Sequence, residues 1–141
     1  MAKTQKKLGE ILAEWGLINP QEADKALEHA RSKSMRIGEA LIDQKLCSEN
    51  NVFKALAAQH NMEYVDLDKS TVPPSLIGSI PEELMRKHLI LPIGQENGRL
   101  RIAIHDPLDL ETIDILRFRL NKELRTVLAP KNRIKRYLDE V

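Results

Sequence analysis

Along the first part of the chain, hydrophobic residues recur at intervals of three and four, the spacing of amphipathic helices. The pattern occurs twice, over residues 7–30 (KLGEILAEWGLINPQEADKALEHA) and residues 36–59 (RIGEALIDQKLCSENNVFKALAAQ), at a constant offset of 29 positions. At that offset seven pairs of residues are identical: Gly9/Gly38, Glu10/Glu39, Leu12/Leu41, Leu17/Leu46, Lys25/Lys54, Ala26/Ala55 and Leu27/Leu56. This agreement indicates an internal repeat. Because one such unit cannot bury its apolar face alone, we expect the two units to pack on each other.

Each repeat is predicted to form a short helix, a turn and a longer helix. In the first repeat, the short helix ends before Gly16, which can adopt the left-handed conformation common after helix C-termini. Asn19 is then expected to cap the longer helix, with Pro20 in its first position and Glu22 completing a capping box. This second helix is predicted to run to about Arg31.

In the second repeat, Ser48 is expected to cap the longer helix, and Lys45 stands where the first repeat has Gly16. A lysine can hold the left-handed turn at some cost in strain. The residues expected to face inward share helical spacing: Leu8, Ile11, Leu12, Trp15, Ala23, Ala26, Leu27 and Ala30 in the first repeat, and Ile37, Ala40, Leu41, Leu46, Val52, Phe53, Leu56 and Ala57 in the second.

The helical spacing is lost after His60, and residues 62–67 are interpreted as an extended link or a short strand. Pro73 and Pro74 break the chain, so a boundary between subdomains is predicted over residues 68–74. Beyond it the pattern predicts a helix over 82–88, strands over 89–93, 100–104 and 124–128, a turn at 95–98, a helix capped by Asp106 with Pro107 in its first position, and a last helix around 134–138.

The predicted fold class is therefore α+β. A four-helix repeat subdomain is expected over residues 1–67, followed by a small α/β subdomain with a roughly three-stranded sheet over residues 74–141. The order strand, helix, strand after the hairpin predicts a crossover unit packed on this sheet.

The composition argues against several classes of protein. Hydrophobic residues make up 42% of the chain and charged residues 30%, which is the balance of a folded soluble domain. A net charge of +1 and an aromatic content of 4% argue against a DNA- or RNA-binding surface. The single cysteine, Cys47, suits a reducing cytoplasm, and no membrane-spanning run or secretory signal is present.

Catalytic and metal chemistry find little support in the sequence. It contains no G-x-x-x-x-G-K-[ST] motif, so a P-loop is absent. Cys47 is interpreted as a small apolar residue. The histidines show no metal-ligand spacing: His29, His60, His88 and His105. The acidic residues Asp106, Asp109, Glu111 and Asp114 are interpreted as the cap and first-turn charges of one helix. We therefore expect no catalytic residue, no metal site and no enzyme activity.

The openings of the two repeats offer a more specific possibility. Each begins with a basic residue, an apolar residue and a glycine: Lys7, Leu8 and Gly9, and Arg36, Ile37 and Gly38. Glycine allows backbone or ligand to approach closely, and the planar guanidinium of Arg36 suits a phosphate or a guanine edge. The Gln59 amide, at the end of the second repeat, can pair with a base edge. Spacing alone favours the alternative, in which Arg36 and Gln59 are solvated and Gly38 is a packing glycine.

The two repeats resemble the paired motif RLGxxLxxxGxxxxxxLxxxLxxQ of MshEN-type domains, the N-terminal part of the assembly ATPases of type II secretion and type IV pilus systems. Two 24-residue units with five residues between them fit that motif. The run LPIGQENGRLRIAIHDPLDLETIDILRF and the strand TVLAP resemble the following subdomain of the same family. The resemblance covers nearly the whole chain.

The resemblance implies two functions. Some members bind cyclic di-GMP, with one motif for each half of the dinucleotide, and this is the only ligand or cofactor it suggests. The corresponding residues here are Arg36, Ile37, Gly38, Val52, Leu56 and Gln59 in the second motif and Lys7, Leu8, Gly9, Ala23 and Leu27 in the first. The first motif departs most from the family pattern, since Lys7 replaces arginine and Ala30 replaces the closing glutamine. In addition, Ala23 and Val52 provide smaller apolar contacts than the pattern implies, and Lys45 replaces a glycine.

Other members use this region to dock on the cytoplasmic domain of an inner-membrane platform protein. The function expected here is docking and regulation of such an ATPase, at the cytoplasmic side of the inner membrane and without membrane insertion. Cyclic di-GMP sensing is the alternative. The P-loop motor of the family is absent from the sequence. Whether the chain is a fragment or a free-standing protein, which system it serves and its oligomeric state stay open.

Overall fold

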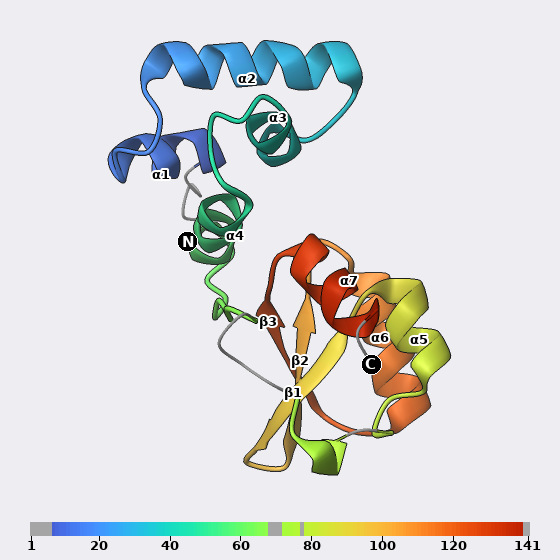
Figure 1. Cartoon of the computed structure of the whole chain (residues 1–141). Helices are drawn as coiled ribbons and strands as arrows, with labels where there is room; N and C mark the ends of the chain where they lie inside the picture. The colour runs from blue at the N-terminus through green and yellow to red at the C-terminus, as the bar shows by residue number, and fades with distance from the viewer. Residues whose placement is uncertain (1–6, 68–71, 77, 140–141) are drawn as a thin grey trace. The chain divides into compact units, whose positions relative to one another are not determined.

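The computed structural model describes residues 7–67, 72–76 and 78–139, and the contacts divide the chain into two compact units, Met1–Asn61 and Met62–Val141 (Figure 1). The described part of the first unit forms four helices: α1 (Leu8–Glu14), α2 (Pro20–Lys33), α3 (Ile37–Asp43) and α4 (Glu49–Gln59). The predicted order of short and long helices is confirmed. α1 packs mainly against α4 and α2 against α3, so each repeat places its short helix on the long helix of the other.

The turns between short and long helices match in the two repeats. Gly16 has a φ of 74° and Lys45 a φ of 58°, so the lysine holds the left-handed conformation that the repeat predicted for it. The Asn19 side chain accepts a hydrogen bond from the Glu22 N–H at 2.8 Å, and Glu22 accepts one from the Asn19 N–H at 3.0 Å, which confirms the capping box. Ser48 caps α4 as predicted, by accepting from the N–H of Asn51.

The core of the first unit contains most of the residues predicted for it: Leu8, Ile11, Leu12, Ala26, Ala30, Ala40, Leu41 and Val52, with Ala23, Ile37, Leu46 and Leu56 partly buried against them. It also contains Ile18 and Ala55, which the pattern did not predict. Two predicted core residues are exposed instead. Trp15 is 46% exposed because α1 ends at Glu14 and Trp15 is its C-cap. Leu27 is 40% exposed because the buried side of α2 consists of Ala26 and Ala30.

The second unit contains a three-stranded mixed sheet in the order β1-β2-β3: β1 (Leu91–Glu96), β2 (Arg99–Ile104) and β3 (Leu124–Leu128). β1 and β2 are antiparallel and joined at Asn97 and Gly98, whose φ angles of 51° and 77° suit a two-residue hairpin turn. The predicted hairpin is confirmed. Its first strand begins at Leu91 and not at Leu89, because Leu89 ends the preceding helix in a left-handed conformation (φ 52°).

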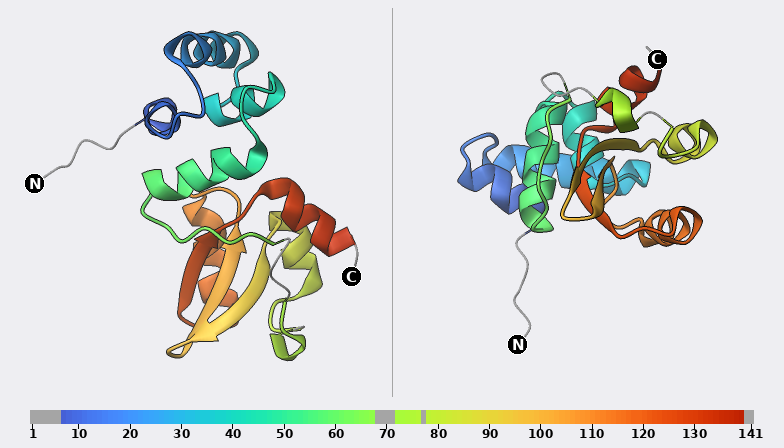
Figure 2. Two further views of the ribbon diagram at one scale, coloured as in Figure 1. Left: turned by 60° about the vertical axis from the view of Figure 1, so that its left-hand side comes forward. Right: turned by 90° about the horizontal axis from the view of Figure 1, so that it is seen from below.

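β2 and β3 are parallel, and the crossover between them is α6 (Leu110–Leu120). α6 and α7 (Lys131–Asp139) lie on opposite faces of the sheet (Figure 2). The α7 face carries a core of Val65, Leu67, Leu91, Ala103, Val127, Ala129, Ile134 and Leu138. α5 (Glu82–His88) is bonded to both helices, through His88 to Thr112 of α6 and through Arg86 to the Leu138 carbonyl of α7. A short 3-10 helix, η1 (Pro74–Leu76), comes before α5.

Residues 62–67 run beside β3 and belong to the second unit. The Val65 N–H donates to the Leu128 carbonyl at 2.9 Å, and the Leu128 N–H donates to the Glu63 carbonyl at 2.8 Å. Val65 and Leu67 are both buried in the core under α7. The contacts therefore divide the chain after Asn61, earlier than the boundary predicted over residues 68–74, of which 68–71 lie outside the described residues. In the described ranges, no helix is long and apolar enough to cross a membrane.

Candidate functional site

The openings of the two repeats have the same backbone geometry. Lys7 precedes α1 with φ −73° and ψ 151°, and Arg36 precedes α3 with φ −75° and ψ 154°. The Glu10 carboxylate accepts a hydrogen bond from the Lys7 N–H at 3.3 Å, and the Glu39 carboxylate accepts one from the Arg36 N–H at 3.4 Å. Lys7 and Arg36 are both exposed, and they occupy equivalent positions at the start of the two repeats.

The glycines of the two openings face residues of the opposite repeat. A methyl group on Gly38 would lie 3.2 Å from Leu8 Cδ2, and one on Gly9 would lie 3.7 Å from Ile37 Cδ1. Each glycine also faces its own long helix, Gly38 at Val52 Cγ1 (3.1 Å) and Gly9 at Ala23 Cβ (4.0 Å). The contacts are reciprocal, so the two openings lie side by side in an approximately two-fold arrangement.

This arrangement brings six of the predicted site residues together, with different exposure. Leu8, Gly38 and Val52 are buried, whereas Gly9, Ala23 and Ile37 are partly buried. Apolar side chains and glycines thus pack together between the two openings, and Lys7 and Arg36 are exposed where the two repeats begin. The exposed cations at the two openings suit an anionic group.

The remaining predicted residues lie on the long helices. Leu56, in α4, packs partly buried on the core that contains Leu8 and Val52. Gln59 is the last residue of α4 and is partly buried, while Leu27 of α2 is exposed. A ligand role for these three residues stays a prediction. The exposure of Leu27, which contradicts its expected place in the core, leaves its side chain accessible.

Cys47 lies in the turn before α4, partly buried against the core of the first unit. Burial raises the pKa of its thiol, so the neutral form dominates further above neutral pH than in a free thiol. This agrees with its interpretation as a small apolar residue and gives no sign of a reactive thiolate.

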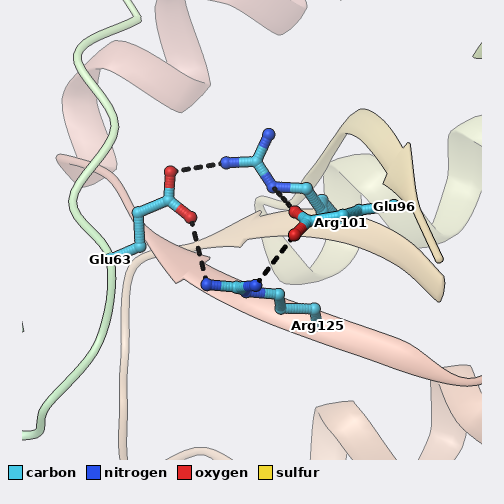
Figure 3. A network of polar contacts seen from close by, with 4 residues as sticks. All are labelled: Glu63, Glu96, Arg101 and Arg125. Atoms are coloured by element: carbon cyan, nitrogen blue, oxygen red, sulfur yellow. Dashed lines mark hydrogen bonds and ion pairs between the residues drawn. The ribbon is translucent and has the colours of Figure 1, made fainter.

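A ring of four charged residues in the second unit was not predicted (Figure 3). Arg101 contacts Glu63 at 2.6 Å and Glu96 at 3.7 Å, and Arg125 contacts Glu96 at 3.3 Å and Glu63 at 3.7 Å. Arg101 and Arg125 are register partners on β2 and β3. The alternation of polar and apolar residues along these strands could therefore have placed the two arginines on the same face of the sheet. Glu63 could not be found in this way, because the pairing of residues 62–67 was not apparent. Each arginine faces both carboxylates, so the ring fixes residues 62–67 to the sheet.

The acidic group before and within α6 is structural, as predicted, but the cap is a different residue. Asp109, and not Asp106, is the N-cap, because its carboxylate accepts from the Thr112 N–H at 3.2 Å and α6 begins at Leu110. Asp106 accepts from the Leu108 N–H at 3.0 Å in the turn before the helix. The buried Thr112 hydroxyl also donates to Asp109 and contacts His88 Nδ1 at 3.1 Å. No cluster of three or more potential metal ligands occurs among the residues that the structure describes.

Curated relatives match nearly the whole chain. The type IV pilus assembly ATPase PilB of Myxococcus xanthus is 29% identical over 133 residues, which is 94% of this chain and 24% of PilB. Bacteriophage adsorption protein B of Escherichia coli K12 is 27% identical over 132 residues, which is 94% of this chain and 18% of that protein. The chain thus spans a quarter or less of these relatives.

Solved structures match the fold of the whole chain. The structure of MshE with cdg, an abbreviation of cyclic di-GMP, has a TM-score of 0.79 and 29% identity, and covers 96% of this chain and 98% of that chain. The N-terminal domain of XpsE has a TM-score of 0.71 at 20% identity, and covers 99% of this chain and 97% of that chain, so it supports the fold alone.

The model of one protein family, the MshEN domain, matches residues 60–141. The match contains the sheet and the helices of the second unit, while the relatives and solved structures extend the likeness over the repeats. The family model covers more than half of the chain, so the chain belongs to the MshEN domain family.

Proposed function

We propose that this chain is a regulatory N-terminal domain and that its first unit binds cyclic di-GMP at the two repeat openings. The observation that carries the proposal is their reciprocal packing, in which Leu8 meets Gly38 and Ile37 meets Gly9. Cyclic di-GMP has two identical halves, and a site made of two equivalent turns matches that symmetry. The likeness to MshE with cdg, at 29% identity, supports the same ligand.

In this proposal each side chain contacts a different part of the ligand. Arg36 offers a planar pair of donors to a guanine edge or a phosphate, and Lys7 offers one positive charge at the equivalent point. The partly buried Gly9 and Ile37 take the apolar faces of the bases. Gln59 supplies an amide to a base edge at the end of α4.

Calorimetric titration of the whole chain with cyclic di-GMP tests the proposal. We expect the wild-type chain to bind and Arg36→Ala to lose measurable binding, because the change removes the arginine at a repeat opening. Arg31→Ala is the matched control, since Arg31 is an exposed arginine in the last turn of α2. Absence of heat with the wild-type chain, or equal affinity in Arg36→Ala, would contradict the proposed site.

A second function, docking on the cytoplasmic domain of an inner-membrane platform protein, is favoured by exposed hydrophobic residues in α6 and in the turn before it. Leu108, Leu110 and Phe118 are 61%, 65% and 86% exposed, and they are the exposed large hydrophobic residues of the second unit in the described part of the chain. Exposed large apolar side chains supply anchors for protein contacts, and aromatic residues are enriched among such anchors. Exposed Arg117 and Arg119 flank Phe118, which suits a partner with acidic residues around an apolar pocket.

Co-purification with the platform protein's cytoplasmic domain from the same organism tests this second function. We expect Phe118→Ala to weaken the complex by at least about tenfold, as loss of an interface anchor does. Trp15→Ala is the control, because Trp15 is an exposed aromatic residue of the first unit. Equal loss in both variants, or none in Phe118→Ala, would argue against docking through α6.

A further inference from the structure

One side of α6 is exposed along the length of the helix. Thr112 and Leu116 are buried, and α6 lies against one face of the sheet (Figure 2). On the other side, exposed residues recur at intervals of three and four, so they share one face of the helix: Leu110, Glu111, Asp114, Arg117 and Phe118. We call this set the outer face of α6. Leu110 and Phe118 are 65% and 86% exposed, so both large apolar side chains of the outer face are in contact with water.

The charges on the outer face are divided between the two halves of the helix. The first half carries the carboxylates of Glu111 and Asp114, and the second half carries the guanidinium of Arg117. Asp114 and Arg117 lie 3.3 Å apart where the two halves meet. Leu110 and Phe118 are eight positions apart, which is about 12 Å along the helix axis. The outer face therefore has an apolar residue toward each end and opposite charges in its two halves.

This pattern restricts which partner fits the outer face. A surface of one charge, such as an anionic membrane, attracts one half of the face and repels the other. A second copy of α6 in antiparallel orientation places the acidic half of each helix opposite the basic half of the other. It also brings Leu110 of each copy to the level of Phe118 of the other. Asp114 then lies close to the two-fold axis, where its own Arg117 compensates its charge.

We propose that two copies of the chain associate through the outer faces of α6, antiparallel and related by a two-fold axis. The inference goes beyond the proposed function, because the partner is the chain itself. Phe118 belongs to both surfaces, so self-association competes with docking on a platform protein. The outer face is part of one 11-residue helix, and we expect it to bury less than the about 1,200 Å² of a stable interface. The dimer should therefore be weak and reversible, with a Kd on the order of 100 µM.

Sedimentation velocity of the whole chain, over concentrations from about tenfold below to tenfold above that Kd, tests the association. We expect the sedimentation coefficient of the wild-type chain to rise from the monomer to the dimer value. Phe118→Ala should raise the Kd at least about tenfold, because it removes the aromatic anchor of the face. Trp15→Ala is the control, since Trp15 is an exposed aromatic residue outside α6 and should leave the Kd unchanged. A wild-type chain that stays monomeric throughout, or an equal effect of the two variants, would overturn the inference.

Charge reversal tests the antiparallel arrangement. One variant, Glu111→Lys with Asp114→Lys, makes the outer face basic throughout, and another, Arg117→Glu, makes it acidic throughout. All three residues are exposed, so both variants should keep the circular dichroism of the wild-type chain. We expect each variant alone to stay monomeric where the wild-type chain dimerises, and an equimolar mixture of the two to form a dimer again. Phe118→Ala in both partners should abolish the mixed dimer, which separates specific pairing from attraction between net charges.

The outcomes for self-association and for docking are separable. If either charge-reversed variant dimerises alone as the wild-type chain does, or if the mixture stays monomeric, the antiparallel pairing is wrong. If the wild-type chain is monomeric and Phe118→Ala still weakens the complex with the platform protein's cytoplasmic domain, this inference fails while docking through α6 stands.

Discussion

At the scale of single residues, Gly9 and Gly38 have equivalent places in the repeats but different amounts of space. A methyl group on Gly38 would be 3.1 Å from Val52 and 3.2 Å from Leu8, both buried, whereas on Gly9 the shortest distance is 3.7 Å. Neither glycine has a positive φ, so backbone conformation does not require them. The missing side chain at Gly38 is therefore what allows Leu8 of the first repeat to pack at the second opening.

Substitution of each glycine by alanine distinguishes the gain in helix propensity from the cost of fitting an added methyl group. Both residues lie within short helices, where alanine is favoured over glycine by about 0.5–1 kcal/mol. We expect Gly9→Ala to raise the free energy of unfolding by about that amount. Gly38→Ala should lower it by about 1 kcal/mol, because overpacking against Val52 and Leu8 exceeds the gain in propensity.

Urea unfolding of the two variants, followed by circular dichroism, measures this difference. Gly9→Ala serves as the matched control, since it changes the equivalent position of the other repeat, where an added methyl group has no neighbour closer than 3.7 Å. Equal stabilisation in both variants would mean that Val52 and Leu8 move aside readily, and that the openings are less tightly packed than the distances indicate.

At the scale of the elements, the repeat made the four helices of the first unit predictable, because the seven identical pairs and the caps recur at one offset. The reciprocal contact of the two openings was not predictable, because it depends on α1 packing with α4 and α2 with α3. Leu27 shows the limit of helical spacing: small alanines form the buried side of α2, so the larger side chain beside them is exposed.

The start of α6 shows a further limit of sequence signals. Asp106-Pro107 is a typical helix opening, yet the chain first makes a turn through Leu108 and the helix begins after Asp109. Asp109 is stabilised in this role by a second contact, with the buried Thr112 hydroxyl, which also bonds to His88 of α5. Both Asp106 and Asp109 were visible as acidic candidates, but the burial of Thr112 and its contact with His88 of α5 were not.

Removal of the Asp109 carboxylate tests its role as the cap. We expect Asp109→Ala to lower the free energy of unfolding by about 1–2 kcal/mol, because the Thr112 N–H loses its acceptor and the buried hydroxyl loses a partner. Asp114→Ala is the control, since Asp114 is exposed and paired only on the surface with Arg117, and should cost about 0.5 kcal/mol or less. Chemical denaturation of both variants provides the comparison, and a smaller loss in Asp109→Ala than in Asp114→Ala would contradict the cap.

At the scale of the whole molecule, the chain consists of two compact units, and residues 62–67 decide where one ends and the other begins. The sequence placed the boundary at the two prolines, since their effect on the backbone is local and easily recognised. The structure places residues 62–67 beside β3, held by two backbone hydrogen bonds, by Val65 and Leu67 in the core, and by Glu63 in the charged ring. These interactions involve residues far along the chain, so no local pattern revealed them.

Fragments of the second unit test this division. We expect residues 62–141 to unfold cooperatively, and a fragment of residues 74–141, which starts at the predicted boundary, to be less stable by about 3 kcal/mol or more. The loss follows from the two buried side chains, Val65 and Leu67, each of which contributes about 1.5–3 kcal/mol on burial. Urea unfolding of both fragments gives the difference. Because the shorter fragment can fail to fold, Val65→Ala within residues 62–141 provides a second measurement, with an expected loss of about 1–2 kcal/mol. Equal stability of the two fragments, with no effect of Val65→Ala, would assign residues 62–67 to the link and restore the boundary at the prolines.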